Sequence, residues 1–242
     1  MKITAKTDIG LVRSTNEDTY TFIKRDDGNF LAFVCDGMGG HLGGAFASSK
    51  AVEMMNNSFN AFFEKKRTKS IGVWLFDVIT KINAFIYEES ISNETLKGMG
   101  TTITGVVKIN NEIYYAHIGD SRIYIYNNDE LRQITTDHTY VNTLLLNGLI
   151  TYKQSLKHPK KHVLTNALGI RKSVSVDIGQ ISLKENDNLL ICSDGLHNLL
   201  DGKKLLKALN EPLEIDEKIN FIIDKALDLG GNDNITLILL EH

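Results

Sequence analysis

The sequence predicts an α+β domain in which sheets and helices form separate packed layers. Strand-like runs come in consecutive blocks joined by tight turns, which indicates antiparallel pairing. Helices are predicted in pairs between those blocks. A parallel doubly wound sheet would require strands and helices to alternate regularly, so it is disfavoured.

The N-terminal part of the chain predicts three strands and a pair of helices. Residues 2–7 and 19–24 alternate weakly between apolar and polar side chains, and residues 30–35 form a continuous apolar run, as strands do. Apolar residues then recur every three or four positions over 45–65 and over 71–89. This spacing predicts two consecutive amphipathic helices.

The middle of the chain predicts four short strands followed by an irregular flap. The strands are expected at 101–109, 112–118, 122–126 and 131–134. From about 139 to 172 the pattern becomes irregular, with a short helical stretch near 141–149 and a Lys/His-rich segment at 157–162. Long insertions of this kind are often surface flaps with a functional role.

The C-terminal part predicts the remaining strands and helices. Strands are expected at 174–181, 188–192 and 234–240, and helices at 202–209 and 215–229. Because no Pro/Gly/Ser-rich linker or charge block divides the chain, residues 1–242 are expected to form one domain.

Composition and charge exclude several classes of function. The net charge is −3 with both signs interspersed, whereas nucleic-acid-binding proteins generally show a basic stripe. No apolar run approaches the roughly 18 residues of a membrane span, and the N-terminus has no leader pattern, so a cytoplasmic protein without membrane contact is expected. Cys35 and Cys192 lie in apolar runs and predict buried free thiols.

Four aspartates stand at the ends of predicted strands: Asp36, Asp120, Asp194 and Asp233. A buried carboxylate is costly unless it is paired or binds a cation, so this recurrence predicts that the strand ends converge on a metal. Asp36 and Asp194 are each followed by glycine, where the backbone can turn sharply or approach a ligand. Oxygen ligands without a His/Cys cluster favour Mg2+ or Mn2+ over structural Zn2+.

Such a carboxylate cluster suits the hydrolysis of a phosphate ester. Two divalent cations about 3.5–4 Å apart can clamp an in-line displacement at phosphorus and generate hydroxide near neutral pH. That chemistry needs a positive group for the phosphate. Arg13 is the candidate, because a guanidinium offers a planar fork of donors. A surface ion pair between Arg13 and Glu17 or Asp18 is the alternative.

An ordered set of short motifs runs through the chain. They are GLVR at 10–13, NED at 16–18, VCDGMGGH at 34–41, GMGTT at 98–102, HIGDSR at 117–122, SDG at 193–195 and GNDNIT at 231–236. Together they resemble the motifs of the metal-dependent protein phosphatase family, the type 2C serine/threonine phosphatases, in its bacterial form. The resemblance spans essentially the whole chain, and an ordered set is far more specific than any one motif.

The resemblance implies an αββα sandwich, with two packed antiparallel sheets and helices on both outer faces, forming a single phosphatase domain over 1–242. It also implies a pair of Mn2+ or Mg2+ ions held by Asp36, the Gly37 carbonyl, Asp194 and Asp233. Asp120, together with Asp194, would hold a third and looser ion.

The implied reaction is direct attack of a metal-bridging water or hydroxide on phosphoserine or phosphothreonine, without a phosphoenzyme. Arg13 matches the family's phosphate-binding arginine, and Glu17 and Asp18 match an acidic pair that acts mainly through metal-bound waters. The leaving group takes its proton either from His41 or from a metal-bound water, and both stay open. Many eukaryotic relatives place the proposed acid directly after the Asp-Gly pair, where this chain has Met38.

The expected partners are phosphorylated Ser/Thr proteins and a cognate Ser/Thr protein kinase as the opposing enzyme, and a monomer is expected. Two other interpretations stay open: a catalytically silent pseudoenzyme that binds phosphoproteins, and a phosphatase for small phosphoesters. Loss of a metal-binding acid would mark a pseudoenzyme, and all four aspartates are present. Direct catalytic roles are not expected for the scattered histidines, which are His117, His138, His158, His162 and His197.

Overall fold

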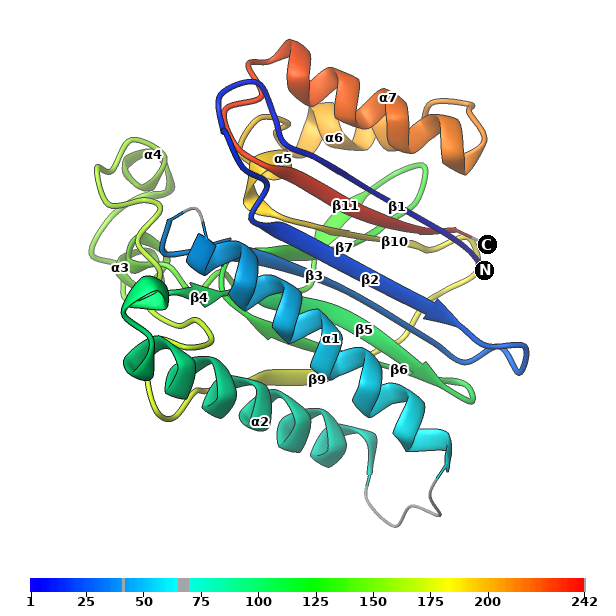
Figure 1. Cartoon of the computed structure of the whole chain (residues 1–242). Helices are drawn as coiled ribbons and strands as arrows, with labels where there is room; N and C mark the ends of the chain where they lie inside the picture. The colour runs from blue at the N-terminus through cyan, green and yellow to red at the C-terminus, as the bar shows by residue number, and fades with distance from the viewer. Residues whose placement is uncertain (41, 65–69, 242) are drawn as a thin grey trace.

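Two antiparallel sheets pack face to face, and helices cover both outer sides (Figure 1). The structure is a computed structural model that describes residues 1–40, 42–64 and 70–241. All strand pairs named within these residues are antiparallel. The predicted α+β class and the αββα sandwich are therefore confirmed.

Each sheet combines strands that are distant in the sequence. The first sheet has the order β1 (Lys2–Asp8), β11 (Ile235–Glu241), β10 (Asn188–Cys192), β7 (Arg122–Tyr126) and β8 (Leu131–Gln133). The second has the order β2 (Asp18–Lys24), β3 (Phe30–Met38), β5 (Ile103–Ile109), β6 (Glu112–Ile118) and β9 (Asp177–Ile181), with β4 (Gly100–Thr101) paired to the end of β3. Because β1 pairs with β11, both ends of the chain belong to the first sheet (Figure 1).

The helices divide between the two outer faces and one end of the sandwich (Figure 1). Helices α1 (Leu42–Glu64) and α2 (Ile71–Ser92), followed by the 3-10 turn η1 (Glu94–Leu96), cover the second sheet. Helices α5 (Asp194–His197), α6 (Gly202–Leu209) and α7 (Ile215–Asp228) cover the first. The short helices α3 (Tyr140–Leu146) and α4 (Tyr152–Ser155) lie at one end. Among the described residues, no helix has the length and apolarity needed to cross a bilayer.

Strand β3 is apolar over residues 30–35 because both of its faces are buried there. Its residues Leu31, Phe33 and Cys35 pack against α1 and α2, and the alternate residues Phe30, Ala32 and Val34 pack against the first sheet. All six are at most 2% exposed. Since burying one large apolar side chain contributes about 1.5–3 kcal/mol, this strand is a main link between the helical layer and the sheets.

The structure differs from the sequence predictions mainly at short elements. Helix α1 starts at Leu42 rather than at residue 45, because Gly43 and Gly44 are helical in spite of their low propensity. The predicted C-terminal end of this helix, residue 65, lies outside the described residues. The strand predicted at 174–181 covers only Asp177–Ile181, and the four-residue helix α5 was not predicted. Elements of this length carry too few residues to show a periodicity.

Candidate metal and phosphate site

One pocket at an end of the sandwich collects nearly all of the predicted site residues. It has a volume of about 500 Å3, and its lining includes Arg13, Glu17, Asp36, Gly37, Asp120, Asp194 and Asp233. Asp18 lies outside this lining, and His41 lies outside the described residues. The prediction that carboxylates from distant strand ends meet in space therefore agrees with this pocket.

The four aspartates reach the pocket from both sheets. Asp36 is near the end of β3, and Asp120 sits in the turn between β6 and β7. Asp194 is the first residue of α5, directly after β10, and Asp233 shortly precedes β11. Each carboxylate is thus placed by the end of a buried strand, which holds its backbone in a rigid position.

The glycines that follow Asp36 and Asp194 are required by close packing. A Cβ at Gly37 would collide with the carbonyl oxygens of Gly44 and Glu17, and one at Gly195 would collide with the carbonyl of Asn234. Neither glycine has a positive φ. These residues therefore allow backbone segments to approach closely beside the pocket, and any side chain there would displace its acidic neighbours.

The backbone of Asp36 is fixed by two threonines of the 98–102 motif. The Asp36 amide donates to Thr102 Oγ1 at 2.9 Å, and the Asp36 carbonyl accepts from the Thr102 amide and from Thr101 Oγ1, both at 2.9 Å. Thr102 Oγ1 also contacts Ser121 Oγ at 2.8 Å. These buried hydrogen bonds connect the end of β3 to the turn that carries Asp120.

The carboxylates of the pocket strongly influence one another. Burial, followed by the charges of neighbouring aspartates, raises the pKa of both Asp36 and Asp120 well above the ordinary value. Burial also works to raise the pKa of Asp194, but His162, His197 and the amide of Asn198 outweigh it, so that this pKa is lowered. Two of the carboxylates are therefore costly to ionise without a cation nearby.

Asp18 lies beneath the pocket rather than on its wall. It pairs with Asp36 in the register between β2 and β3, and its Oδ2 accepts from Ser193 Oγ at 2.7 Å. Burial raises the pKa of Asp18 to about 7, although the hydrogen bonds from Ser193 and Thr236 oppose this shift. Asp18 therefore adds a buried titratable group next to the carboxylates that line the pocket.

Arg13 pairs with Asp233, and not with Glu17 or Asp18 as in the alternative interpretation. Its Nη2 donates to Asp233 Oδ2 at 2.7 Å, while the arginine side chain remains 52% exposed. The loop that carries Arg13 is fastened by Asn234, whose Nδ2 donates to the carbonyls of Ile9 and Thr15 at 2.9 and 3.0 Å. The guanidinium is thus positioned at the pocket with most of its donors free for another ligand.

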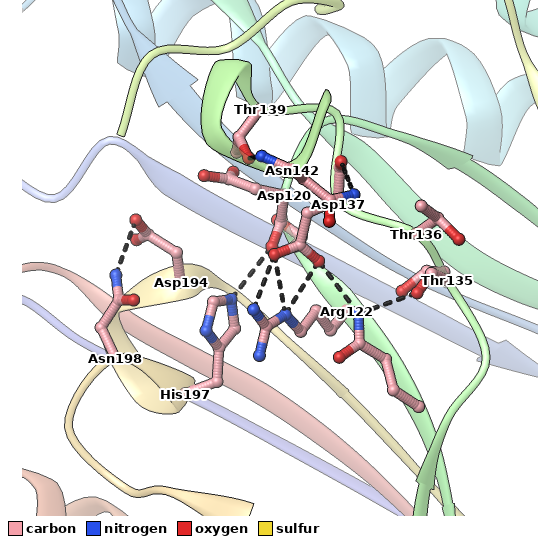
Figure 2. Close-up of polar contacts among 12 residues, drawn as sticks. Asp120, Arg122, Thr135, Thr136, Asp137, Thr139, Asn142, Asp194, His197 and Asn198 are labelled. Carbon is pink, nitrogen blue, oxygen red and sulfur yellow. Dashed lines mark hydrogen bonds and ion pairs between the residues drawn. The ribbon is translucent and has the colours of Figure 1, made fainter. Parts of the chain in front are cut away.

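An ion pair and a buried histidine support the turn at Asp120 (Figure 2). Arg122 Nε and Nη2 donate to the carboxylate of Asp137 at 2.9 and 2.6 Å. His197 Nε2 donates to the Asp120 carbonyl at 3.0 Å. Burial, reinforced by the charge of Arg122, lowers the pKa of His197 to about 4, so the ring is neutral at pH 7 and keeps this donor.

Sequence reasoning missed several side chains at the site. His197 and Asn198 stand three and four residues after Asp194, on the same helical turn, and Asn198 Nδ2 donates to Asp194 Oδ2 at 3.0 Å (Figure 2). That spacing was a usable signal. His162 lines the pocket with its Nδ1 3.9 Å from Asp194 Oδ2, a placement that no local pattern indicated.

The donor set of the pocket fits a divalent cation. As the side chains lie, no three His, Cys, Asp or Glu side chains of the described residues surround one point at ligand spacing. The fit rests instead on chemistry: carboxylates from both sheets share one pocket, and the pKa values of Asp36 and Asp120 are raised by burial and by mutual repulsion. A hard divalent cation removes that repulsion.

A neutral buried histidine near the site should make the fold sensitive to acid. His117 is fully buried, with Nδ1 2.9 Å from Thr104 Oγ1 and Nε2 3.0 Å from the carbonyl of Thr136. Burial, followed by the charge of His138, lowers the pKa of His117 to about 4. A histidine whose pKa is lower in the folded than in the unfolded state favours the folded state while it is neutral. The contribution of His117 to the free energy of unfolding is therefore complete above the unfolded pKa of about 6.5 and is lost as pH falls toward 4.

We expect the free energy of unfolding of the native protein to fall, relative to that of His117→Gln, by about 2 kcal/mol between pH 7.5 and pH 5. Urea unfolding with a chelator present throughout measures it, and referring each pH to the variant cancels the titration of the other groups. An equal loss in both proteins would show that His117 is not the responsible group.

The layered fold and its carboxylate and arginine pocket define a class, the metal-dependent phosphatases. The sequence pattern of the family described as protein phosphatase 2C matches residues 12–220. The chain belongs to this family.

The chain is also similar to individual members along its whole length. It is 36% identical over 237 residues to "Serine/threonine phosphatase stp" of Listeria monocytogenes serotype 4b, covering 98% of this chain and 94% of that protein. It is 37% identical over 244 residues to a "Putative protein phosphatase 2C-type" of Streptococcus pyogenes serotype M6, covering 100% and 98%. The crystal structure of serine/threonine phosphatase Stp1 from Staphylococcus aureus superposes with a TM-score of 0.92 at 32% identity, covering 100% and 94%.

These matches confirm the predicted class. The chain is a protein serine/threonine phosphatase of the type 2C family, and the family implies a dependence on divalent metal and substrates that are phosphoproteins.

Proposed function

We propose that this protein hydrolyses phosphoserine and phosphothreonine in proteins by direct attack of water, without a covalent phosphoenzyme. The observation that carries the proposal is the pocket in which Asp36, Asp120, Asp194 and Asp233 meet beside Arg13. No cysteine lines this pocket within the described residues, and Cys35 and Cys192 are both fully buried. A thiol nucleophile therefore has no support.

The residues that would hold the cations follow from their position in the pocket. We assign the inner sphere to Asp36, the Gly37 carbonyl, Asp194 and Asp233, and a third and looser ion to Asp120 with Asp194. Mn2+ and Mg2+ are the ions that carboxylate and carbonyl oxygens favour. When bound, the ions would activate a water and neutralise charge on the phosphoryl group.

Glu17 and Asp18 are proposed to contact the ions indirectly. Glu17 lines the pocket, and its amide donates to Asn234 Oδ1 at 2.8 Å, so its backbone is anchored next to Asp233. Asp18 is buried behind Asp36 and is bound by Ser193. We propose that both residues act on the ions through water.

Arg13 would bind the phosphate of the substrate. Its contact with Asp233 holds the guanidinium at the pocket, and its exposed donors can form charge-assisted hydrogen bonds to phosphate oxygens. The proton for the leaving oxygen remains assigned either to His41 or to a water on the ions.

The wider organisation is also part of the proposal. We infer one catalytic domain over 1–242 in which 139–172 forms a flap beside the pocket, with His162 and Leu164 contributing to the pocket wall. We further propose that the protein acts as a monomer in the cytoplasm, opposite a Ser/Thr protein kinase.

Substitution of Arg13 by alanine tests the phosphate contact. Because a hydrogen bond to a charged group contributes about 1.5–3 kcal/mol, we expect kcat/KM on a phosphothreonine peptide to fall by about 10- to 150-fold, mainly through a higher KM. Arg13→Lys should recover part of the loss, since an ammonium retains the charge but not the planar fork.

Arg132→Ala is the matched control, because Arg132 is exposed on β8 and lies outside the pocket. An unchanged kcat/KM in Arg13→Ala would reject the phosphate-binding role. The same assay with a sugar phosphate decides the substrate class, since a higher kcat/KM on the sugar phosphate than on the peptide would favour a small-phosphoester phosphatase.

A further inference from the structure

A second and smaller pocket adjoins the candidate active site. Met38 and Leu164 line both pockets, so the two pockets share a wall. The smaller pocket is completed by Ala167, Ile170 and others, and has a volume of about 220 Å3. This is below the about 300–1,000 Å3 of pockets for drug-sized ligands, and it suits a single side chain.

Two side chains of this pocket pack against a glycine. A Cβ at Gly100 would lie 2.7 Å from the carbonyl oxygen of Leu168, 2.8 Å from Met38 Cε and 3.0 Å from Ile170 Cδ1, so the absence of a side chain at Gly100 lets the ends of Met38 and Ile170 lie close to the backbone. Met38 is only partly buried, and Ile170 is 45% exposed. The two side chains therefore present apolar surface to whatever enters the pocket.

The backbone next to Ala167 of this pocket is held in place by β4. Thr101 and Leu168 exchange two backbone hydrogen bonds, of 3.1 and 2.9 Å, which attach this part of the chain to β4. Asn166 also lines the pocket, but the Nδ2 of its side chain donates to the carbonyl of Ser175 at 2.8 Å. The pocket is consequently preformed. Its apolar part is made by Met38, Leu164 and Ile170, and Thr165 and Arg171 complete the lining.

We propose that this pocket is a specificity subsite that receives a bulky aliphatic side chain from a substrate residue flanking the phosphorylated serine or threonine. The inference rests on the proposed function, because it requires the phosphorylated residue to occupy the pocket of Asp36 and Arg13. Because the two pockets share a wall and an extended peptide advances only about 3.3–3.6 Å per residue, a residue close to the phosphorylated one in sequence can reach the second pocket. The occupant is thus a neighbour of the phosphorylated residue in sequence.

The test is a leucine scan of a phosphothreonine peptide. Leucine replaces serine at each of three positions on either side of the phosphothreonine, in an otherwise constant peptide. We expect leucine at one position to raise kcat/KM by about ten-fold, mainly through a lower KM, because its side chain leaves water. In Ile170→Ser that preference should fall at least three-fold, and in Ile170→Leu it should persist.

Two controls separate this effect from damage to the active site. N-acetyl-phosphothreonine methylamide has no flanking side chain, so Ile170→Ser should hydrolyse it as the native protein does. Ile91→Ser changes a matched isoleucine that is 68% exposed and lies outside this pocket, and it should keep the leucine preference.

A flat leucine scan, an undiminished preference in Ile170→Ser, or an equal loss in Ile91→Ser would overturn the subsite. A protein that hydrolyses neither the peptides nor the methylamide would contradict the proposed function instead, so the two failures are distinguishable.

Discussion

Replacing Asp36 or Asp194 by asparagine should lower kcat/KM on a phosphothreonine peptide by at least about a thousand-fold. Each substitution removes one negative charge from the proposed inner sphere, and the charge stabilisation supplied by a metal in such reactions amounts to several kcal/mol. Each side chain is anchored at a strand end from a different sheet, so neither can substitute for the other. Steady-state rates at saturating Mn2+ measure the effect.

The fold should survive the Asp36→Asn substitution. Burial and neighbouring carboxylates raise the pKa of Asp36, which means that its ionised form destabilises the folded state at neutral pH. An isosteric neutral amide removes that cost, so the thermal midpoint in a chelator should be equal to or above that of the native protein. Asp26→Asn, at an exposed site, is the matched control and should change neither activity nor stability. Normal turnover in Asp36→Asn would reject the inner-sphere assignment.

Removal of divalent cations should abolish turnover, and Mn2+ in excess over the chelator should restore it. Without bound cations, no positive charge offsets the mutual repulsion of the carboxylates of Asp36, Asp120 and Asp194. Binding should also be visible without any substrate, because a ligand at 100 times its Kd stabilises the folded protein by about 2.7 kcal/mol. A higher thermal midpoint on adding Mn2+ to the chelated protein measures this effect.

Asp194→Asn provides the control for the cation experiment, because its thermal midpoint should respond much less to Mn2+ than that of the native protein. Full turnover in a protein shown by elemental analysis to contain no divalent metal would contradict the mechanism. A rise in midpoint of the same size in Asp194→Asn would place the ions somewhere else in the molecule.

Much of the fold could be predicted because its strands and long helices have clear local patterns of apolar residues. The continuous apolar run of β3 and the three- and four-residue spacing of α1 and α2 follow from burial of one or both faces. The four-residue helix α5 and the first turn of α1, with its two glycines, were missed. Both are set by packing around the pocket, which overrides local propensity.

The candidate site was predictable to the extent that its residues recur in a pattern. Acid and glycine at the ends of apolar runs indicated Asp36 and Asp194, but the reason for the glycines is contact with the backbones of Gly44 and Asn234. The pairing of Arg13 with Asp233 joins residues 220 positions apart, so no local rule could have found it.

The kind of chemistry this protein performs can be read from residue types and their order, which specify carboxylate donors, an arginine and the strands that carry them. Which side chains share the pocket depends on the folded arrangement, which also places His162, His197 and Asn198 beside the acids and a smaller pocket next to them. The physical reason is distance: hydrogen bonding, desolvation and charge repulsion act over a few ångströms, and folding alone sets those separations.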